Sequence, residues 1–423
     1  MTIVRMASLA CLVSAAFGLM ASAKAEGNWV ASWAASPQQP VDAVTSGTPL
    51  DTPPRSFSDQ TIRQTVRLST GGRALHLRLT NEYGATATTL DAVRVGISDG
   101  KGGVLPGSDR TVTFNGGSTT VTLSAAAPAL SDPVDLAVPS LGSLTISIYV
   151  PKGGNPGYAT PHTLGQQTTY VVSGDQTGAV SLANASTGTV RYFLSGVDVL
   201  KNEHAFTVVT FGDSITDGYG STVDTNHRWP DLFAERLQNS KLLDRLGVAN
   251  EGISGNRVLT DGFGPNALSR FDRDVLACPG VRYVVLLVGI NDVGIPKVFP
   301  TTGAMPSADD IIAGYRQMIA RGHARGVRVI GATLTPYQGA IDGKYYSDQG
   351  EAEREAINSF IRNSKAFDGV IDLDAAVRDH ANPLSFDPKY DSGDHLHPND
   401  AGYAAMAAAI DLRLFQASAS EGH

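Results

Sequence analysis

Two short motifs in the second half of the chain contain a serine, an acid and a base. Gly212-Asp213-Ser214 supplies the serine, and Asp394-His395-Leu396-His397 supplies an aspartate and a histidine three residues apart. A serine hydroxyl attacks an ester carbonyl once a base takes its proton. His397 can be that base, and Asp394 can fix the tautomer of the imidazole and stabilise its charged form. Ser214, Asp394 and His397 are therefore a candidate catalytic triad.

Two further motifs supply donors for the negative charge that develops in acyl transfer. Gly255 lies in Ile253-Ser254-Gly255, and Asn291 lies in Gly289-Ile290-Asn291-Asp292. Backbone N–H groups of Ser214 and Gly255, with the side-chain amide of Asn291, can donate to an oxyanion. Gly255 permits a close approach because it has no Cβ. We therefore expect Ser214, Gly255 and Asn291 to form an oxyanion hole.

The elements that must position these motifs are expected strands of a parallel sheet. The run at 281–288 is almost continuously apolar, as is typical of a strand buried on both faces. Similar runs are found at 206–211, 247–250, 327–334 and 370–373. Helical patterns lie between them, at 231–237, 307–319, 351–361 and 401–412. Alternating strands and helices predict an α/β fold with a parallel sheet covered on both sides. Reactive side chains then gather beyond the carboxyl ends of the strands, where the four motifs lie.

The first half of the chain shows a different pattern. Residues from about 26 to 200 are rich in Thr, Ser, Gly and Val, and turn residues recur about every ten positions. Apolar and polar residues alternate at 62–68 and again at 75–80, separated by Gly71-Gly72, which predicts a β-hairpin. Further strands are expected at 111–114, 120–123 and 144–150. These segments predict an all-β sandwich. Four basic side chains are expected on a solvated face of the hairpin: Arg63, Arg67, His76 and Arg78.

The four motifs, in this order, resemble the sequence blocks of the SGNH hydrolases, also called the GDSL family. The resemblance covers roughly residues 206–415 and implies a three-layer α/β/α sandwich, ester hydrolysis and no cofactor. Ile290 stands where many members have a second glycine, which leaves Asn291 in register. Within the family, the sequence is most similar to secreted bacterial esterases that carry an N-terminal β-domain.

Composition and the N-terminus bear on partners and location. The 423 residues include 33 Lys and Arg against 41 Asp and Glu, a net charge of -8 that argues against nucleic acid as a partner. Arg5, an apolar run at 6–21 and Ala23-Lys24-Ala25 are typical of a cleaved signal peptide. We expect a signal peptide at 1–25, a β-sandwich domain at 26–204 and a hydrolase domain at 205–423. The mature chain is then secreted or periplasmic, without stable membrane insertion, since no later segment approaches 18 apolar residues.

The sequence also contains residues that could form a metal site or a sugar-binding surface. His395, His397 and Asp394 could bind zinc, but no other His or Cys motif supplies further ligands, so we expect no metal. Trp29 and Trp33 are expected to anchor the β-domain core rather than form a sugar platform. The resemblance favours hydrolysis of acetyl or short-chain acyl esters of a small molecule or glycan. A polysaccharide O-acetyl deacetylase and a non-catalytic glycan-binding protein remain as alternatives.

Overall fold

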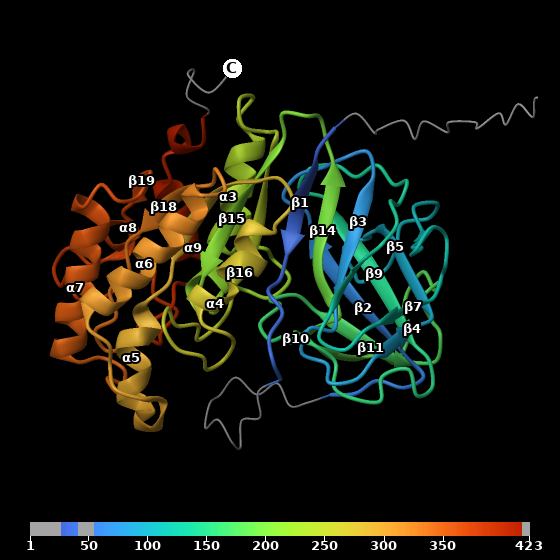
Figure 1. Ribbon diagram of the computed structural model, residues 1–423, viewed down its shortest axis with the longest axis horizontal. Coiled ribbons are helices and arrows are strands. Elements are labelled where there is room, and N and C mark those ends of the chain that lie inside the picture. Colours follow the sequence, from blue (N-terminus) through green and yellow to red (C-terminus); the bar gives the residue numbers. More distant parts are fainter. Residues whose placement is uncertain (1–26, 41–54, 417–423) are drawn as a thin grey trace, which may run out of the picture.

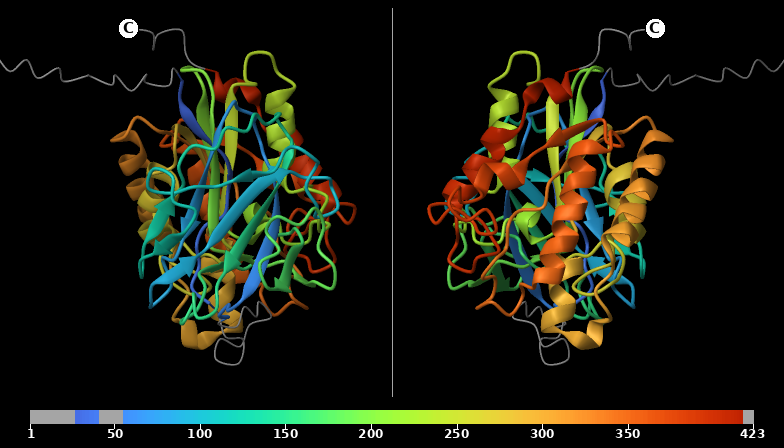
Figure 2. Two further views of the ribbon diagram at one scale, coloured as in Figure 1. Left: turned by 90° about the vertical axis from the view of Figure 1, so that its right-hand side faces the viewer. Right: turned by 90° about the vertical axis from the view of Figure 1, so that its left-hand side faces the viewer.

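The computed structural model describes residues 27–40 and 55–416, which form an all-β part and an α/β part packed against each other (Figure 1). This confirms the predicted architecture. Figure 2 shows the strands of the β part from one side and the helices of the α/β part from the opposite side. The predicted signal peptide lies outside the described residues.

The β part contains two main antiparallel sheets. One has the order β1 (Trp29–Ala34), β14 (Leu194–Leu200), β3 (Leu75–Thr80) and β8 (Pro128–Leu130). The other has the order β12 (Ser186–Gly188), β11 (Thr169–Ser173), β2 (Gln60–Arg67), β9 (Ser143–Val150), β5 (Ala92–Ile97) and β6 (Arg110–Thr111). Two small ribbons pair β4 (Thr88–Leu90) with β7 (Val121–Leu123) and β10 (Pro161–His162) with β13 (Arg191–Tyr192). Apolar side chains from both main sheets form one buried core.

The predicted hairpin at 62–80 is wrong. β2 pairs with β9 and β11, whereas β3 pairs with β14 and β8, so the two strands belong to different sheets. The alternating pattern correctly marks both strands, and Ile62 and Leu77 are both buried in the same core. The apolar face of each strand must be buried, and the two strands bury these faces against each other's sheet. The segment with Gly71-Gly72 therefore passes between the sheets.

The expected row of solvated basic residues is also wrong. Arg63 is buried: its Nε donates to Oγ of Ser147 at 2.8 Å, and its Nη2 donates to the carbonyl oxygen of Ala179 at 2.6 Å. Arg67 pairs with Glu235 of the α/β part at 2.9 Å. A buried guanidinium needs such partners, because an unpaired buried charge is costly.

The α/β part is built on a five-stranded parallel sheet. Its order is β16 (Leu246–Gly252), β15 (Phe206–Gly212), β17 (Val281–Leu287), β18 (Arg328–Ala332) and β19 (Gly369–Ile371). In chain order this is 2-1-3-4-5, so the winding direction changes between β15 and β17. Open α/β sheets bind ligands beyond the carboxyl ends of the strands at such a point.

Two groups of helices cover the sheet and complete the three layers. One group comprises α3 (Trp229–Gln238), α8 (Leu373–Val377) and α9 (Asp400–Ala409). The other comprises α4 (Ala267–Phe271), α5 (Ile290–Val298), α6 (Ala308–His323) and α7 (Asp348–Asn363). The short helix α2 (Ser214–Asp217) directly follows β15. A capping box begins α6: the Ser307 side chain accepts from the N–H of Asp310, and the Asp310 carboxylate accepts from the N–H of Ser307. None of the helices in the described ranges is both long and apolar enough to cross a membrane.

Strand β1 joins the two parts because its side chains belong to two cores. Val30 and Trp33 pack into the β-part core, whereas Ala31 and Ala34 pack into the core of the α/β part. β1 lies beside β16 at the edge of the parallel sheet, and a Cβ added at Gly247 would lie 2.4 Å from the carbonyl oxygen of Ala31. Small residues therefore allow the two backbones to approach closely.

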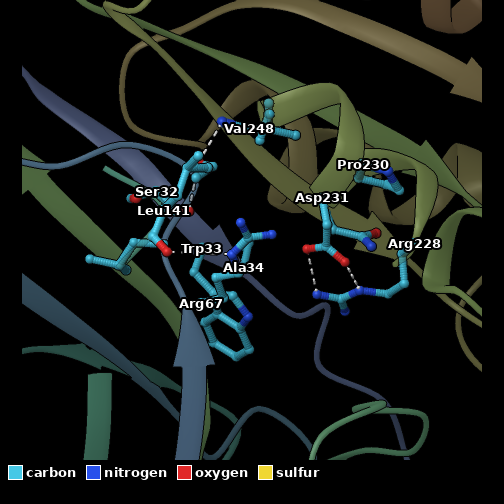
Figure 3. Close-up of a pocket in the computed structure, with 13 residues that line it drawn as sticks. Ser32, Trp33, Ala34, Arg67, Leu141, Arg228, Pro230, Asp231 and Val248 are labelled. Carbon is cyan, nitrogen blue, oxygen red and sulfur yellow. Dashed lines mark hydrogen bonds and ion pairs between the residues drawn. The ribbon is translucent and has the colours of Figure 1, made fainter. Parts of the chain in front are cut away.

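Polar contacts flank this apolar junction (Figure 3). The N–H of Val248 donates to Oγ of Ser69 at 2.8 Å, and an ion pair joins Arg228 to Asp231 at 2.6 Å on the α/β side. The space enclosed between these groups is only about 20 Å³, close to the volume that one water needs. The two parts thus form a tightly packed interface.

Candidate active site

The structure brings the three residues of the candidate triad into one chain of hydrogen bonds. Oγ of Ser214 lies 2.7 Å from Nε2 of His397, and Nδ1 of His397 lies 2.6 Å from Oδ2 of Asp394. Because Nδ1 faces a carboxylate, it carries the proton, and the lone pair of Nε2 faces the serine hydroxyl. His397 can therefore accept the proton of Ser214.

Ser214, the candidate nucleophile, lies on a sharp turn between a strand and a helix. β15 ends at Gly212, and Ser214 is the first residue of α2. Asp213 caps α2, since its side chain accepts from the N–H of Ile215 at 3.0 Å. A Cβ at Gly212 would lie 2.4 Å from the carbonyl oxygen of Leu287, so only glycine fits between β15 and β17 here. The first N–H groups of a helix have no partner within it, so that of Ser214 can serve an oxyanion.

A compact loop orients the acid of the triad. Oδ1 of Asp394 accepts from Oγ of Ser392 at 3.0 Å and from the N–H groups of Leu396 and His397, each at 2.9 Å. Burial alone would raise the pKa of Asp394, but the hydrogen bonds and charge of His397 and these N–H groups lower that pKa overall. Asp394 is thus held ionised, ready to stabilise an imidazolium.

The aromatic ring of Tyr219 packs against the base. Its centroid lies 4.4 Å from that of the His397 imidazole, and its carbonyl oxygen accepts from the hydroxyl of Tyr403 at 2.6 Å. Tyr403 lies on α9, which follows the motif that contains His397. The imidazole is thus held by packing as well as by hydrogen bonds.

The candidate oxyanion donors converge from three strand ends. Gly255 follows β16 with a φ of +75°, a left-handed conformation that favours glycine, and a Cβ there would lie 2.2 Å from the ring of Phe263. Asn291 lies in the first turn of α5, after β17, and is buried. Nδ2 of Asn291 donates one proton to the carbonyl oxygen of Asn256 at 3.0 Å, and Oδ1 accepts from the hydroxyl of Tyr345 at 2.5 Å. These contacts set the orientation of the amide, whose second Nδ2 proton can serve an oxyanion.

Two aspartates next to the site, Asp213 and Asp292, accept hydrogen bonds from backbone N–H groups. Asp292 accepts from the N–H of Val258 at 2.7 Å and from that of Leu259 at 3.2 Å. Burial raises the pKa of Asp213 and the pKa of Asp292 each to about 7. Their hydrogen bonds fix the segments that follow β15 and β16.

The site opens into a pocket of about 680 Å³. All five predicted site residues line it, and most of its remaining wall is apolar, including Phe263, Ile295, Val298, Phe299 and Ile341. Pockets of this size and lining are typical of binding sites for small organic ligands.

Other histidines pair with aspartates. His395 lines the pocket and pairs with Asp391 at 2.5 Å, and His227 pairs with Asp400 at 3.0 Å. Among the described residues, no group of three or more His, Cys, Asp or Glu side chains is placed to hold a metal ion. Nε2 of His162, a buried residue of the β part, lies 3.1 Å from Oδ1 of Asp217 on α2.

Sequence reasoning missed Tyr219, Tyr345 and His162. Tyr219 follows the serine motif closely in sequence, so its proximity to the site was a usable signal. Tyr345 and His162 lie at least 50 residues from their partners, Asn291 and Asp217, and no spacing rule connects them.

Comparison with known proteins agrees with this geometry. Residues 210–405 match the model of the GDSL-like Lipase/Acylhydrolase family, a range that includes all five predicted site residues. The α/β part of the chain belongs to this GDSL family. Membership of this family indicates that the protein is an ester-hydrolysing enzyme of the acylhydrolase type. No match was found among curated proteins.

Several solved structures are similar to about half of the chain. A putative lipolytic protein of the G-D-S-L family from Desulfitobacterium hafniense is 24% identical, with 48% of this chain and 96% of that chain covered and a TM-score of 0.36. A GDSL-like lipase from Bacteroides thetaiotaomicron is 23% identical, with 49% and 87% covered and a TM-score of 0.37. An acetyl xylan esterase is 25% identical, with 48% and 97% covered and a TM-score of 0.37.

Proposed function

We propose that the protein is a serine esterase that hydrolyses acetyl or short-chain acyl esters through an acyl-enzyme on Ser214. The observation that carries the proposal is the continuous hydrogen-bond chain from Ser214 through His397 to Asp394. The nucleophile, the base and the group that orients the base have the arrangement that nucleophilic catalysis requires.

In the first step, Oγ of Ser214 attacks the ester carbonyl and its proton passes to Nε2 of His397. The resulting oxyanion accepts hydrogen bonds from the N–H groups of Ser214 and Gly255 and from Nδ2 of Asn291. Collapse of this intermediate breaks the bond to the alcohol, which leaves with the proton from His397. The acyl group then remains esterified to Ser214.

In the second step, the reactions of the first step run in reverse order, with water in place of the alcohol. His397 takes a proton from water, the hydroxide adds to the acyl carbon, and the same three donors hold the oxyanion. The carboxylic acid leaves as Oγ of Ser214 regains a proton from His397. Asp394 stays ionised throughout and stabilises the imidazolium that forms in both steps.

The apolar wall of the pocket supports esters with some hydrocarbon surface. A pocket of about 680 Å³ exceeds what an acetyl group alone would fill, so part of the alcohol or a longer acyl chain contacts Phe263, Ile295 and Val298. Each methylene group buried there contributes roughly 0.8 kcal/mol. We expect turnover to extend beyond acetate to butyrate.

We also propose that residues 1–25 are removed on export and that the mature enzyme is secreted or periplasmic. The charged, apolar and small-residue pattern of this segment supports the proposal. N-terminal sequencing of the exported protein should begin at Glu26. Retention of the intact leader would contradict it.

Hydrolysis assays with wild type and Ser214→Ala test the proposed function. The substrates are the p-nitrophenyl esters of acetate, butyrate and octanoate, and acetylated xylan. The proposal predicts turnover of acetate and butyrate that Ser214→Ala abolishes. Turnover of acetylated xylan would extend the function to polysaccharide deacetylation. Absence of turnover on all four substrates would contradict the esterase and favour a glycan-binding protein.

A further inference from the structure

A histidine of the β part reaches the helix that bears the nucleophile. Nε2 of His162 lies 3.1 Å from Oδ1 of Asp217, and Nδ1 of His162 lies 2.9 Å from the carbonyl oxygen of Ser36. His162 and Asp217 are both buried, with 5% and 2% of their surfaces exposed. The pair is thus a buried polar link between the two parts of the molecule.

The hydrogen-bond pattern assigns a charge to this link. A carbonyl oxygen only accepts, so Nδ1 of His162 carries a proton. Oδ2 of Asp217 accepts from both the N–H and the hydroxyl of Ser254, each at 2.9 Å, which is typical of an ionised carboxylate. Nε2 of His162 therefore faces a carboxylate, an arrangement that favours a second proton on the ring and hence an imidazolium.

The charged groups around His162 agree with this assignment. Burial alone would lower the pKa of His162, but the charge and hydrogen bond of Asp217 and the hydrogen bond to Ser36 raise that pKa overall. Glu251, on β16, adds a smaller effect in the same direction. Glu251 itself is buried, and this burial raises its pKa, so Glu251 affects His162 only where its own carboxyl is ionised.

Asp217 connects the nucleophile to the oxyanion hole. It is the last residue of α2, and Ser214 is the first. Its partner Ser254 immediately precedes Gly255, whose N–H is a proposed oxyanion donor. The backbone of α2 also lies close to this loop, because a Cβ at Gly252 would be 2.3 Å from the backbone nitrogen of Asp217. One carboxylate therefore sets the position of the donor relative to the nucleophile.

We propose that the imidazolium of His162 is a positioning residue for the oxyanion hole: it holds Asp217, which in turn holds the Ser254-Gly255 backbone against the nucleophile helix. The proposal rests on the proposed function of Ser214 and Gly255. It gives the β part a role in catalysis without any contact between His162 and the substrate.

Two other contacts place the β part against the same rim of the site. Nε2 of Gln38 donates to the carbonyl oxygen of Phe263 at 2.9 Å, and the Phe263 ring occupies the space beside Gly255. Nε2 of Gln166 donates to the carbonyl oxygen of Gly218 at 2.8 Å, next to Tyr219. The β part thus contacts three segments of the site through His162, Gln38 and Gln166. Of these three contacts, the one made by His162 is an ion pair.

Steady-state kinetics of full-length His162→Ala, with p-nitrophenyl butyrate as substrate, test the proposal. We expect kcat to fall roughly 10- to 100-fold with KM within about twofold, because misplacing one donor affects the transition state. The inhibition constant of butylboronic acid, which adds to Ser214 and places an oxygen in the oxyanion hole, should rise by a similar factor. Arg67→Gln, which removes an ion pair elsewhere in the same interface, should change neither quantity.

His162→Gln separates charge from packing. Its amide can donate to Asp217 but carries no charge, so we expect a smaller loss of kcat than in His162→Ala. In the wild type, kcat/KM should fall on the alkaline side as His162 loses its proton. His162→Gln should lack this decrease. Near-UV circular dichroism verifies the fold of each variant. If His162→Ala does not fold, the kinetics of His162→Gln test the proposal instead.

The outcomes separate this proposal from the proposed function. If wild type hydrolyses the ester and Ser214→Ala does not, the esterase assignment stands. Wild-type kcat and boronate inhibition in a folded His162→Ala or His162→Gln would then overturn the positioning role alone. A loss confined to KM, with boronate inhibition unchanged, would also overturn it. If wild type has no esterase activity, both proposals fail.

Discussion

The hydroxyl of Tyr345 lies 2.5 Å from Oδ1 of Asn291 and therefore donates to it. Both side chains are buried, so this hydrogen bond has little competition from water. With Nδ2 of Asn291 also donating to Asn256, the plane of the amide is fixed before substrate arrives. The third oxyanion donor is thus preorganised by a residue 54 positions away in sequence.

Replacement of Asn291 should therefore affect the chemical step more than binding. Asn291→Ala should lower kcat about 10²- to 10³-fold with a small change in KM. Tyr345→Phe keeps the ring and removes only the orienting hydroxyl, so we expect a loss of roughly tenfold. Steady-state assays on p-nitrophenyl butyrate measure both effects. A Tyr345→Phe loss as large as that of Asn291→Ala would mean that Tyr345 acts on the substrate directly.

The two histidines of the last motif should differ sharply. His397→Ala removes the proposed base and should nearly abolish turnover with folding intact, because Nε2 of His397 is the atom placed to take the proton from Oγ of Ser214. His395→Ala should have a mild effect, since His395 pairs with Asp391 and reaches only the pocket wall. Rate measurements at saturating ester, paired with thermal melts, check this. Equal and severe losses in both variants would refute the choice of His397 as base.

The buried carboxyl of Asp213 should make stability depend on pH. Its pKa is raised to about 7, whereas an aspartate in the unfolded chain loses its proton near 3.8. The unfolded state therefore ionises first, and the contribution of Asp213 to the free energy of unfolding falls as pH rises from about 4 to about 7. Asp213→Asn keeps an oxygen that can accept from Ile215 and cannot ionise.

Chemical denaturation of both proteins between pH 5 and pH 8 measures this effect. The stability of Asp213→Asn relative to wild type should increase across that range, by up to a few kcal/mol at the alkaline end. A relative stability that is constant with pH would show that Asp213 has an ordinary pKa.

The apolar wall of the pocket should set the preference for chain length. Val298 lines the pocket and is only partly buried, so a larger side chain can be accommodated there without disrupting the core. Val298→Trp should lower the ratio of kcat/KM for the octanoate ester to that for the acetate ester, several-fold, because it fills space that a longer chain needs. Val180→Trp, on an exposed loop of the β part, is the matched control. An unchanged ratio in Val298→Trp would place the acyl chain elsewhere.

Much of the fold was predictable because burial leaves a pattern in the chain. The run at 281–288 is apolar since β17 is covered on both faces, and Ser307 marks the start of α6 through its cap. In contrast, α5 was missed because Gly294 and Pro296, both poor helix formers, lie inside it. The pairing of β2 was wrong because an alternating pattern reveals which face is buried and not which strand lies alongside.

The grouping of the candidate reacting residues could be predicted from the sequence, whereas the residues that orient them could not. Ser214, Asn291 and His397 lie in short motifs at strand ends, and a parallel sheet brings such ends together. Tyr345 and His162 reach the site from distant segments, and their neighbours in sequence carry no signal of this. Their roles depend on packing between elements, which local sequence patterns do not encode.

The most direct test of the central claim is covalent labelling with diethyl p-nitrophenyl phosphate, followed by intact mass and peptide mapping. The account predicts one diethylphosphoryl group per chain, located on Ser214, with esterase activity lost in proportion to labelling and no label in Ser214→Ala. Label on another residue, or full activity in a chain that is completely labelled at Ser214, would contradict a serine acyl-enzyme mechanism.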